Sequence, residues 1–69
     1  MEVLLRLPDV LRKTGLRRSA LYLMTRQGRF PRPVKLGERM SAWRESEVDG
    51  WIKSRIEAGR VAQEGGARS

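Results

Sequence analysis

The side chains of this chain best suited to chemistry are arginines, and one group stands out by its spacing. Arg18, Tyr22 and Arg26 follow one another at intervals of four residues, the spacing that places side chains on one face of a helix. A guanidinium at the start of such a helix can donate two hydrogen bonds to O6 and N7 of guanine, or meet a phosphate. The spacing therefore indicates a helical face that recognises a polyanion, and the alternative is an ordinary solvated basic face.

The same sequence offers little for catalysis. It contains no histidine and no cysteine, so the commonest general base, the thiolate nucleophile, disulfides and the usual zinc ligands are missing. Three acids cluster at Glu45, Glu47 and Asp49, but they lie where a helix is expected to begin and where negative charge stabilises the helix dipole. We therefore expect no enzymatic activity, no cofactor and no metal site.

The net charge of +7 lies in one part of the 69-residue chain. Residues 1–40 contain ten Lys and Arg against three Asp and Glu, whereas residues 41–69 contain five of each sign. A basic surface confined to one region is typical of a protein that binds a polyanion, above all double-stranded DNA. The competing hypothesis is a small basic interaction module that binds an acidic partner protein.

Two short helices are expected to present the arginines. Residues 7–16 predict a first helix, which Gly15 can end in the left-handed conformation. Residues 18–27 predict a second helix, whose apolar stripe contains Leu21 and Met24. A turn of about three residues joins them, and this arrangement matches the helix-turn-helix unit.

A β-hairpin and a third helix complete the expected fold. Residues 34–36 and 40–43 predict two strands around a glycine turn, and a third helix begins near Arg44. Trp43 and Trp51 are expected in the core, where strand and third helix pack on the helical pair. The predicted fold is a small α+β winged helix-turn-helix, with three helices and a two-stranded β-hairpin wing.

The chain is long enough for one domain. We assign residues 1–58 to a winged helix-turn-helix DNA-binding domain, because the apolar pattern dissolves from Gly59 onward. Residues 59–69 are interpreted as a disordered C-terminal tail.

The residues expected to contact DNA are basic or hydroxyl-bearing and come from the second helix and the hairpin. The start of the second helix points into the major groove in a helix-turn-helix, and the hairpin tip lies against the flanking backbone or the minor groove. The predicted DNA-binding residues are Arg17, Arg18, Ser19, Tyr22, Arg26, Arg32, Lys35 and Arg39. Leu23 lies outside the apolar stripe, as a single exposed leucine or as part of a partner contact.

Three blocks of sequence, residues 14–22, 28–37 and 42–52, occur together in an order that resembles the AlpA family of prophage regulators. This family lies within the MerR-like and excisionase-like winged helix-turn-helix group. The resemblance implies a regulator of prophage genes, often an integrase gene, or an excision directionality factor that bends DNA. It also implies that residues 18–27 form the recognition helix and that the wing is centred on Gly37. Family members commonly have serine, a helix cap, at the position of Arg17.

The expected partners follow from this reading. Double-stranded DNA is the first, and a recombinase or RNA polymerase bound beside it is the second. We expect a monomer in solution, with several copies assembling on DNA. No run is long and apolar enough for a membrane span and no signal-peptide pattern opens the chain, so the expected location is the cytoplasm, in association with the nucleoid.

Overall fold

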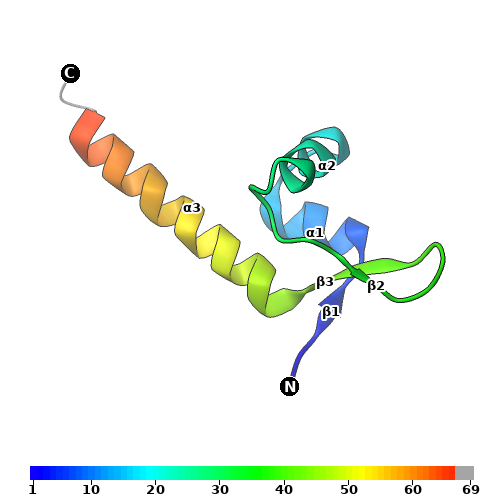
Figure 1. The fold of residues 1–69 in the computed structure, drawn as a ribbon. Helices are drawn as coiled ribbons and strands as arrows, with labels where there is room; N and C mark the ends of the chain where they lie inside the picture. Colours follow the sequence, from blue (N-terminus) through cyan, green and yellow to red (C-terminus); the bar gives the residue numbers. More distant parts are fainter. Residues whose placement is uncertain (67–69) are drawn as a thin grey trace.

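A helix-turn-helix packs on a small sheet, and one long helix extends away from both (Figure 1). This computed structural model describes the backbone of residues 1–66 and the side chains of residues 1–60. The fold is small α+β and has the winged helix-turn-helix arrangement, as the sequence predicts. Its elements in chain order are β1 (Leu4–Leu5), α1 (Leu7–Thr14), α2 (Arg18–Arg26), β2 (Val34–Lys35), β3 (Ser41–Arg44) and α3 (Glu45–Gly66).

The turn between α1 and α2 depends on one glycine. Gly15 has a φ of 75°, a left-handed conformation that residues with a Cβ avoid. Its N–H donates to the Leu11 carbonyl at 2.8 Å, which closes the last turn of α1. Leu16 then packs against the core, and α2 begins at Arg18. The predicted helix-turn-helix connection is confirmed.

The end of α2 is equally well defined. Gly28 also has a φ of 75°. The N–H of Gly28 donates to the Thr25 carbonyl at 3.1 Å, and the N–H of Arg29 donates to the Met24 carbonyl at 2.8 Å. This pair of bonds is the Schellman motif, which satisfies helix carbonyls and turns the chain away from the helix axis. The chain then runs through residues 29–33 to β2.

The sheet has three strands, not the two predicted. Its order is β1-β3-β2 with antiparallel pairing throughout, so β3 is the central strand. Leu5 lies opposite Trp43 on one side of β3, and Val34 lies opposite Ala42 on the other. The prediction missed β1 because a strand of two residues has no alternation to detect.

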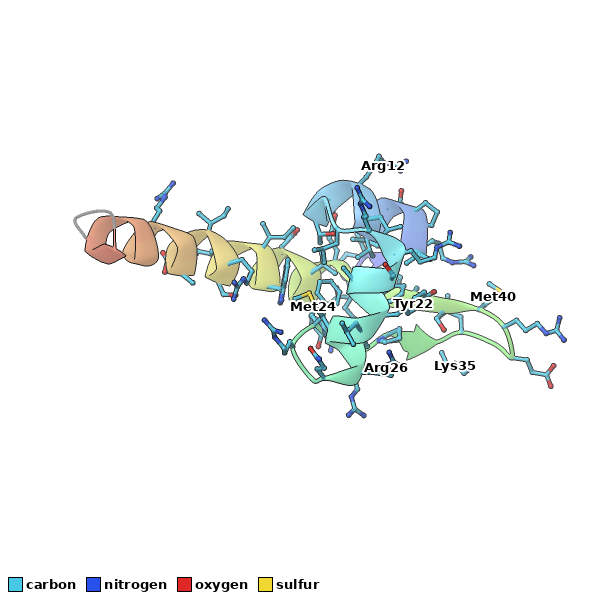
Figure 2. All side chains as sticks on the ribbon, turned by 90° about the horizontal axis from the view of Figure 1, so that it is seen from above. Arg12, Tyr22, Met24, Arg26, Lys35 and Met40 are labelled. Carbon is cyan, nitrogen blue, oxygen red and sulfur yellow. The ribbon has the colours of Figure 1, made fainter. Side chains whose placement is uncertain are left out.

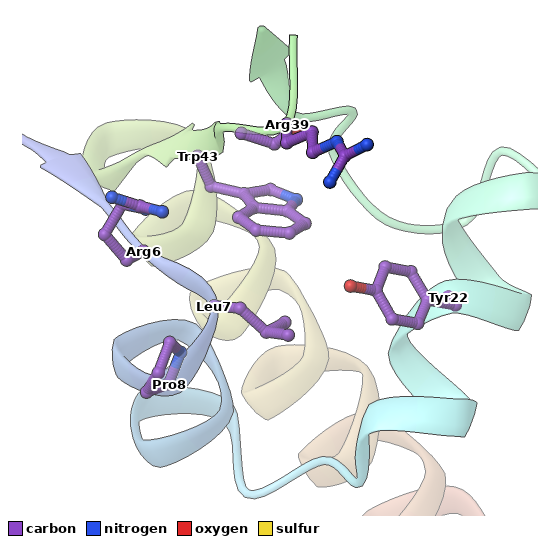
Figure 3. A pocket seen from close by; sticks show the side chains of 7 residues that line it. Arg6, Leu7, Pro8, Tyr22, Arg39 and Trp43 are labelled. Carbon is purple, nitrogen blue, oxygen red and sulfur yellow. The ribbon is translucent and has the colours of Figure 1, made fainter. Parts of the chain in front are cut away.

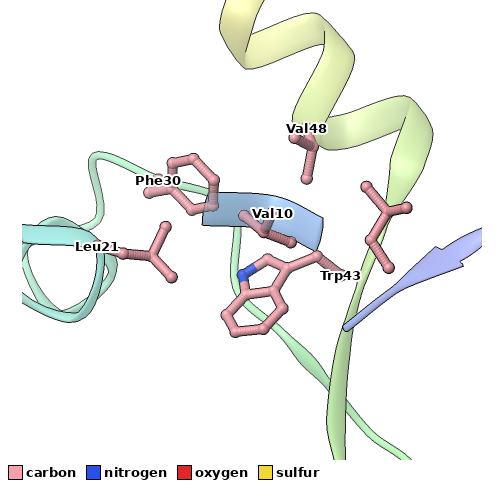
Figure 4. Close-up of a cluster of buried hydrophobic side chains, with 6 residues drawn as sticks. Val10, Leu21, Phe30, Trp43 and Val48 are labelled. Atoms are coloured by element: carbon pink, nitrogen blue, oxygen red, sulfur yellow. The ribbon is translucent and has the colours of Figure 1, made fainter. Parts of the chain in front are cut away.

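The core lies between the helix-turn-helix, β3 and the start of α3 (Figure 4). Its main members are apolar side chains from all of these elements, namely Leu5, Val10, Leu21, Phe30, Trp43 and Val48. Trp43 is only 2% exposed, which confirms its predicted place in the core. Trp51 is half-buried and packs against this cluster from α3. The two tryptophans are therefore both structural, but they are buried to different extents.

Both tryptophans also hold the segment that joins α2 to the hairpin. The indole N–H of Trp43 donates to the Pro31 carbonyl at 3.1 Å, and that of Trp51 donates to the Arg29 carbonyl at 2.8 Å. Phe30 lies between Arg29 and Pro31 in the sequence and is buried. Its ring meets that of Trp51 edge-on, with the ring centroids 4.9 Å apart. These contacts fix the hairpin relative to α2.

The N-terminal segment ties down the start of α3. The Glu2 carboxylate accepts hydrogen bonds from the backbone N–H and the hydroxyl of Ser46 and from the guanidinium of Arg44. Desolvation alone would raise the pKa of Glu2, but these hydrogen bonds outweigh it, and the pKa lies below its ordinary value. A negative charge at a helix N-terminus is also favoured by the helix dipole.

Lys13 connects α1 to the same end of α3. Its ammonium lies 2.6 Å from the Asp49 carboxylate and 3.2 Å from that of Glu45. Its pKa is raised, mainly by the hydrogen bond to Asp49 and then by that to Glu45. The acidic side chains at the start of α3 therefore help to hold α1 against α3.

Helix α3 continues past the end that the sequence predicts. It runs to Gly66, whereas the apolar pattern predicts that helical structure stops before Gly59. That prediction is wrong for residues 59–66, because an established helix extends by one hydrogen bond per added residue without needing an apolar stripe. Residues 67–69 of the predicted tail lie outside the described residues, and the division of the chain at residue 58 stays a prediction.

Candidate nucleic-acid interface

Helix α2 has one face in the core and one in solvent. Leu21 is fully buried and Met24 packs beside the core cluster. Arg18, Tyr22 and Arg26 are all exposed, and the side chain of Tyr22 is 48% accessible. Figure 2 shows Tyr22 and Arg26 on α2, on the side of this helix nearest the hairpin in that view. The structure therefore places the predicted recognition face toward solvent.

The start of α2 is strongly electropositive. Arg17 is the N-cap residue, has extended backbone geometry and makes no side-chain cap hydrogen bond. An arginine has donors only, so its side chain cannot accept from the free N–H groups of the first helical turn. These N–H groups, the positive end of the helix dipole and the exposed side chains of Arg17, Arg18 and Ser19 all lie together. This end of α2 is suited to an anion.

The wing, which comprises β2, β3 and residues 36–40 between them, closes tightly at its tip. The N–H groups of Leu36 and Gly37 donate to the Met40 carbonyl at 2.7 and 3.3 Å. Lys35 is exposed on β2, and its ammonium reaches the Glu38 carbonyl at 3.1 Å. Arg39 is exposed in the turn itself. The wing thus carries its two predicted DNA-binding cations along one hairpin.

The predicted DNA-binding cations stand apart from the salt bridges that the described side chains form. Arg17, Arg18, Arg26, Arg32, Lys35 and Arg39 form no salt bridge with any other residue whose side chain the structure describes. The salt bridges that do form lie elsewhere, where Arg12 pairs with Asp9, Lys13 with Glu45 and Asp49, and Arg44 with Glu2 and Glu47. The cations of α2 and the wing are therefore available to an external anion.

A hollow of about 250 Å³ separates α2 from the wing (Figure 3). Arg6, Leu7 and Pro8 line it at the start of α1, Tyr22 lines it from α2, and residues of the wing complete it. Those wing residues are Arg39, Ser41 and Trp43. The hollow brings two predicted site residues, Tyr22 and Arg39, to one place.

Sequence reasoning did not include Arg6 in the site. Arg6 directly follows β1 and is the N-cap residue of α1. Its position beside the wing results from the pairing of β1 with β3. The only signal in the sequence was one more cation in the basic region, and nothing there placed it near the wing.

Three further findings concern Leu23, metal ligands and membrane-spanning helices. Leu23 is 46% exposed and stands outside the core cluster. Within the described residues, acidic side chains do not gather in a group that could hold a metal ion. No helix in the described part of the chain has the length and apolarity to span a membrane.

Comparison with known proteins assigns this arrangement to a family. The family model described as the prophage CP4-57 regulatory protein (AlpA) matches residues 3–56. That match covers both helices of the helix-turn-helix, all three strands and the first half of α3. The chain belongs to the AlpA family. This is a family of prophage regulatory proteins and not of enzymes, as the sequence blocks predict.

Two relatives support the AlpA assignment. The chain is 38% identical over 58 residues to the DNA-binding transcriptional activator AlpA of Escherichia coli K12, a match that covers 75% of this chain and 83% of that protein. It is 48% identical over 59 residues to the uncharacterized protein ORF88 of Enterobacteria phage P4. That match covers 86% of this chain and 66% of ORF88, so the chain spans just under two thirds of the phage protein. No solved structure matches the chain.

Proposed function

We propose that this AlpA-family protein binds double-stranded DNA in a sequence-specific manner and regulates prophage-type genes. The observation that carries the proposal is the exposed face of α2. Arg18, Tyr22 and Arg26 lie there beside a basic wing and have no acidic partner among the residues whose side chains the structure describes. The similarity to a relative described as a DNA-binding transcriptional activator supports it.

The proposed docking follows from the positions of the side chains. Helix α2 enters the major groove by its N-terminal end, where Arg18 donates two hydrogen bonds to a guanine edge. Arg17 and Ser19 contact phosphate at the same end of the helix. Arg26 extends the contact along the exposed face of α2. Phosphate contacts set the register, and the base contact supplies the sequence preference.

The wing and its connection contact the flanking DNA. Lys35 and Arg39 project from the hairpin toward the neighbouring backbone or minor groove, and Arg32 lies exposed in the segment that leads into β2. Because the indole N–H groups of Trp43 and Trp51 hold that segment, α2 and the wing approach DNA as one preformed surface.

One copy of so small a module buries only about 600–1,000 Å² on DNA. We therefore propose that the protein is a monomer in solution and that several copies assemble on repeated sites, beside a recombinase or RNA polymerase. In this proposal the bound protein either activates transcription or assists the excision of a prophage. It acts in the cytoplasm, at the nucleoid.

A salt titration tests DNA binding. The affinity for a fluorescent duplex is measured at several salt concentrations for the wild type, Arg26→Gln and Arg60→Gln. Arg60 is a matched control, because it is an exposed cation on the part of α3 that extends away from α2.

Contact with five to seven phosphates predicts a log–log slope of about −4 to −6. Arg26→Gln should make the slope shallower by about 1, whereas Arg60→Gln should leave it unchanged. A slope near zero, together with tight binding to polyglutamate, would instead support the acidic-protein partner and overturn the proposal.

A further inference from the structure

The hollow between α2 and the wing combines polar groups on an apolar base. Arg6 and Arg39 contribute guanidinium groups, and Tyr22 and Ser41 contribute hydroxyls. Leu7, Pro8 and Trp43 supply the apolar surface. Figure 3 shows the Tyr22 hydroxyl directed from α2 across the hollow toward α1 and β3. Besides the indole N–H of Trp43, which donates to the Pro31 carbonyl, the lining contains four side chains that can donate a hydrogen bond and no carboxylate.

None of these four groups is engaged elsewhere in the described part of the chain. The side chains of Arg6, Tyr22, Arg39 and Ser41 form no hydrogen bond or salt bridge with another described residue. A surface with several free donors, two positive charges and no acid favours an anionic occupant.

The topology explains why these groups meet. Ser41 and Trp43 are alternate residues of β3, so they share a face, and Arg39 lines the same hollow from the turn that precedes β3. Pairing of β1 with the opposite edge of β3 carries the chain to Arg6, at the start of α1. Tyr22 closes the hollow from α2. The result is a positively charged hollow that includes Arg39 of the wing, Arg6 and Trp43.

The position of the hollow suggests what the anion is. A sugar–phosphate backbone separates the major groove from the adjacent minor groove. A protein with one element in each groove must therefore straddle that backbone, and the space between the two elements faces a phosphate. The hollow has a volume of about 250 Å³, which leaves room for a phosphodiester.

We propose that the hollow is the seat of one DNA phosphodiester. Arg6 and the hydroxyls of Tyr22 and Ser41 hold its oxygens, and Arg39 lies at the outer end of the seat. The proposal rests on the proposed function and adds two residues, Arg6 and Ser41, to the interface. It also assigns Tyr22 to the sugar–phosphate backbone of DNA and not to a base.

The test compares Arg6→Gln with Arg60→Gln on duplexes in which a neutral methylphosphonate replaces one phosphate at successive positions. On unmodified DNA, Arg6→Gln should bind about tenfold more weakly, by the same factor on preferred and random sequences, and Arg60→Gln should bind like the wild type. At one methylphosphonate position, the wild type should lose affinity and the penalty of Arg6→Gln should disappear. Ser41→Ala, which removes only a hydroxyl, should show smaller coupling at the same position.

The outcomes are distinct. If the wild type binds duplex DNA with the expected salt slope but the Arg6→Gln penalty is the same on every methylphosphonate duplex, the phosphate seat is wrong and the proposed function stands. If the wild type does not bind duplex DNA, both fail. If inorganic phosphate raises the melting temperature of the wild type and not of Arg6→Gln, while no methylphosphonate position removes the Arg6→Gln penalty, the hollow is a site for a free anion, and the proposal is overturned. Circular dichroism of each variant establishes that it is folded. If Arg6→Gln is not folded, the coupling of Ser41→Ala to the methylphosphonate position decides the test.

Discussion

Replacement of each tryptophan by alanine should rank the two residues by burial. Trp43 is 2% exposed and donates to the Pro31 carbonyl, so its truncation leaves a cavity and an unpaired acceptor. Truncating a buried tryptophan costs about 3–5 kcal/mol. A core of this size rarely supplies more than about 3–5 kcal/mol in total. Trp43→Ala should therefore be largely unfolded at 25 °C.

Trp51→Ala should be milder, since this side chain is only half-buried and packs against the outside of the cluster. Trp51 buries less apolar surface than Trp43, and we expect a cost of about 1.5–2.5 kcal/mol. Urea denaturation followed by far-UV circular dichroism measures both values. Equal costs, or a larger cost for Trp51→Ala, would refute the ranking of the two tryptophans by burial.

Two further perturbations act on the ends of helices. Arg17→Ser should raise the free energy of unfolding by about 1 kcal/mol, because a serine side chain can accept a hydrogen bond from the N–H groups that start α2. Urea denaturation measures this gain. If there is none, the start of α2 needs no cap. In the folded protein the pKa of Glu2 lies below its ordinary value of 4.5. The ionised carboxylate therefore stabilises the fold at pH values above 4.5, and this stabilisation is lost as the pH falls through the lower pKa of the folded state. The melting temperature of Glu2→Gln should lie below that of the wild type at pH 7, and the two values should converge in acid. A difference that stays constant from pH 7 into acid would contradict a stabilising role for the Glu2 carboxylate.

Much of the fold is predictable from local signals. Gly15 and Gly28 mark the ends of α1 and α2 because only a residue without a Cβ readily takes a φ of 75°. The four-residue spacing of Arg18, Tyr22 and Arg26 predicts their common exposed face, since the apolar stripe of Leu21 and Met24 takes a different side of the helix to reach the core.

The parts that were missed depend on contacts between distant residues. Strand β1 exists because Leu4 and Leu5 pair with β3, about forty residues away, and two residues carry no periodic signal. The position of Arg6 depends on that pairing, so the hollow beside Tyr22 could not be predicted either. The extension of α3 beyond Gly59 was missed because helix propagation needs no amphipathic pattern.

Selection of binding sites from a pool of random duplexes tests most directly whether α2 reads DNA sequence. Wild type, Arg18→Ala and Lys35→Ala are compared at one salt concentration. We predict that the wild type enriches a defined sequence and that Arg18→Ala loses the preference for guanine at one position, with a penalty of about 1–3 kcal/mol on the wild-type site. Lys35→Ala should enrich the wild-type sequence with lower affinity. Enrichment of one unchanged sequence by all three proteins, or of none by the wild type, would contradict the assignment of α2 as the reading helix.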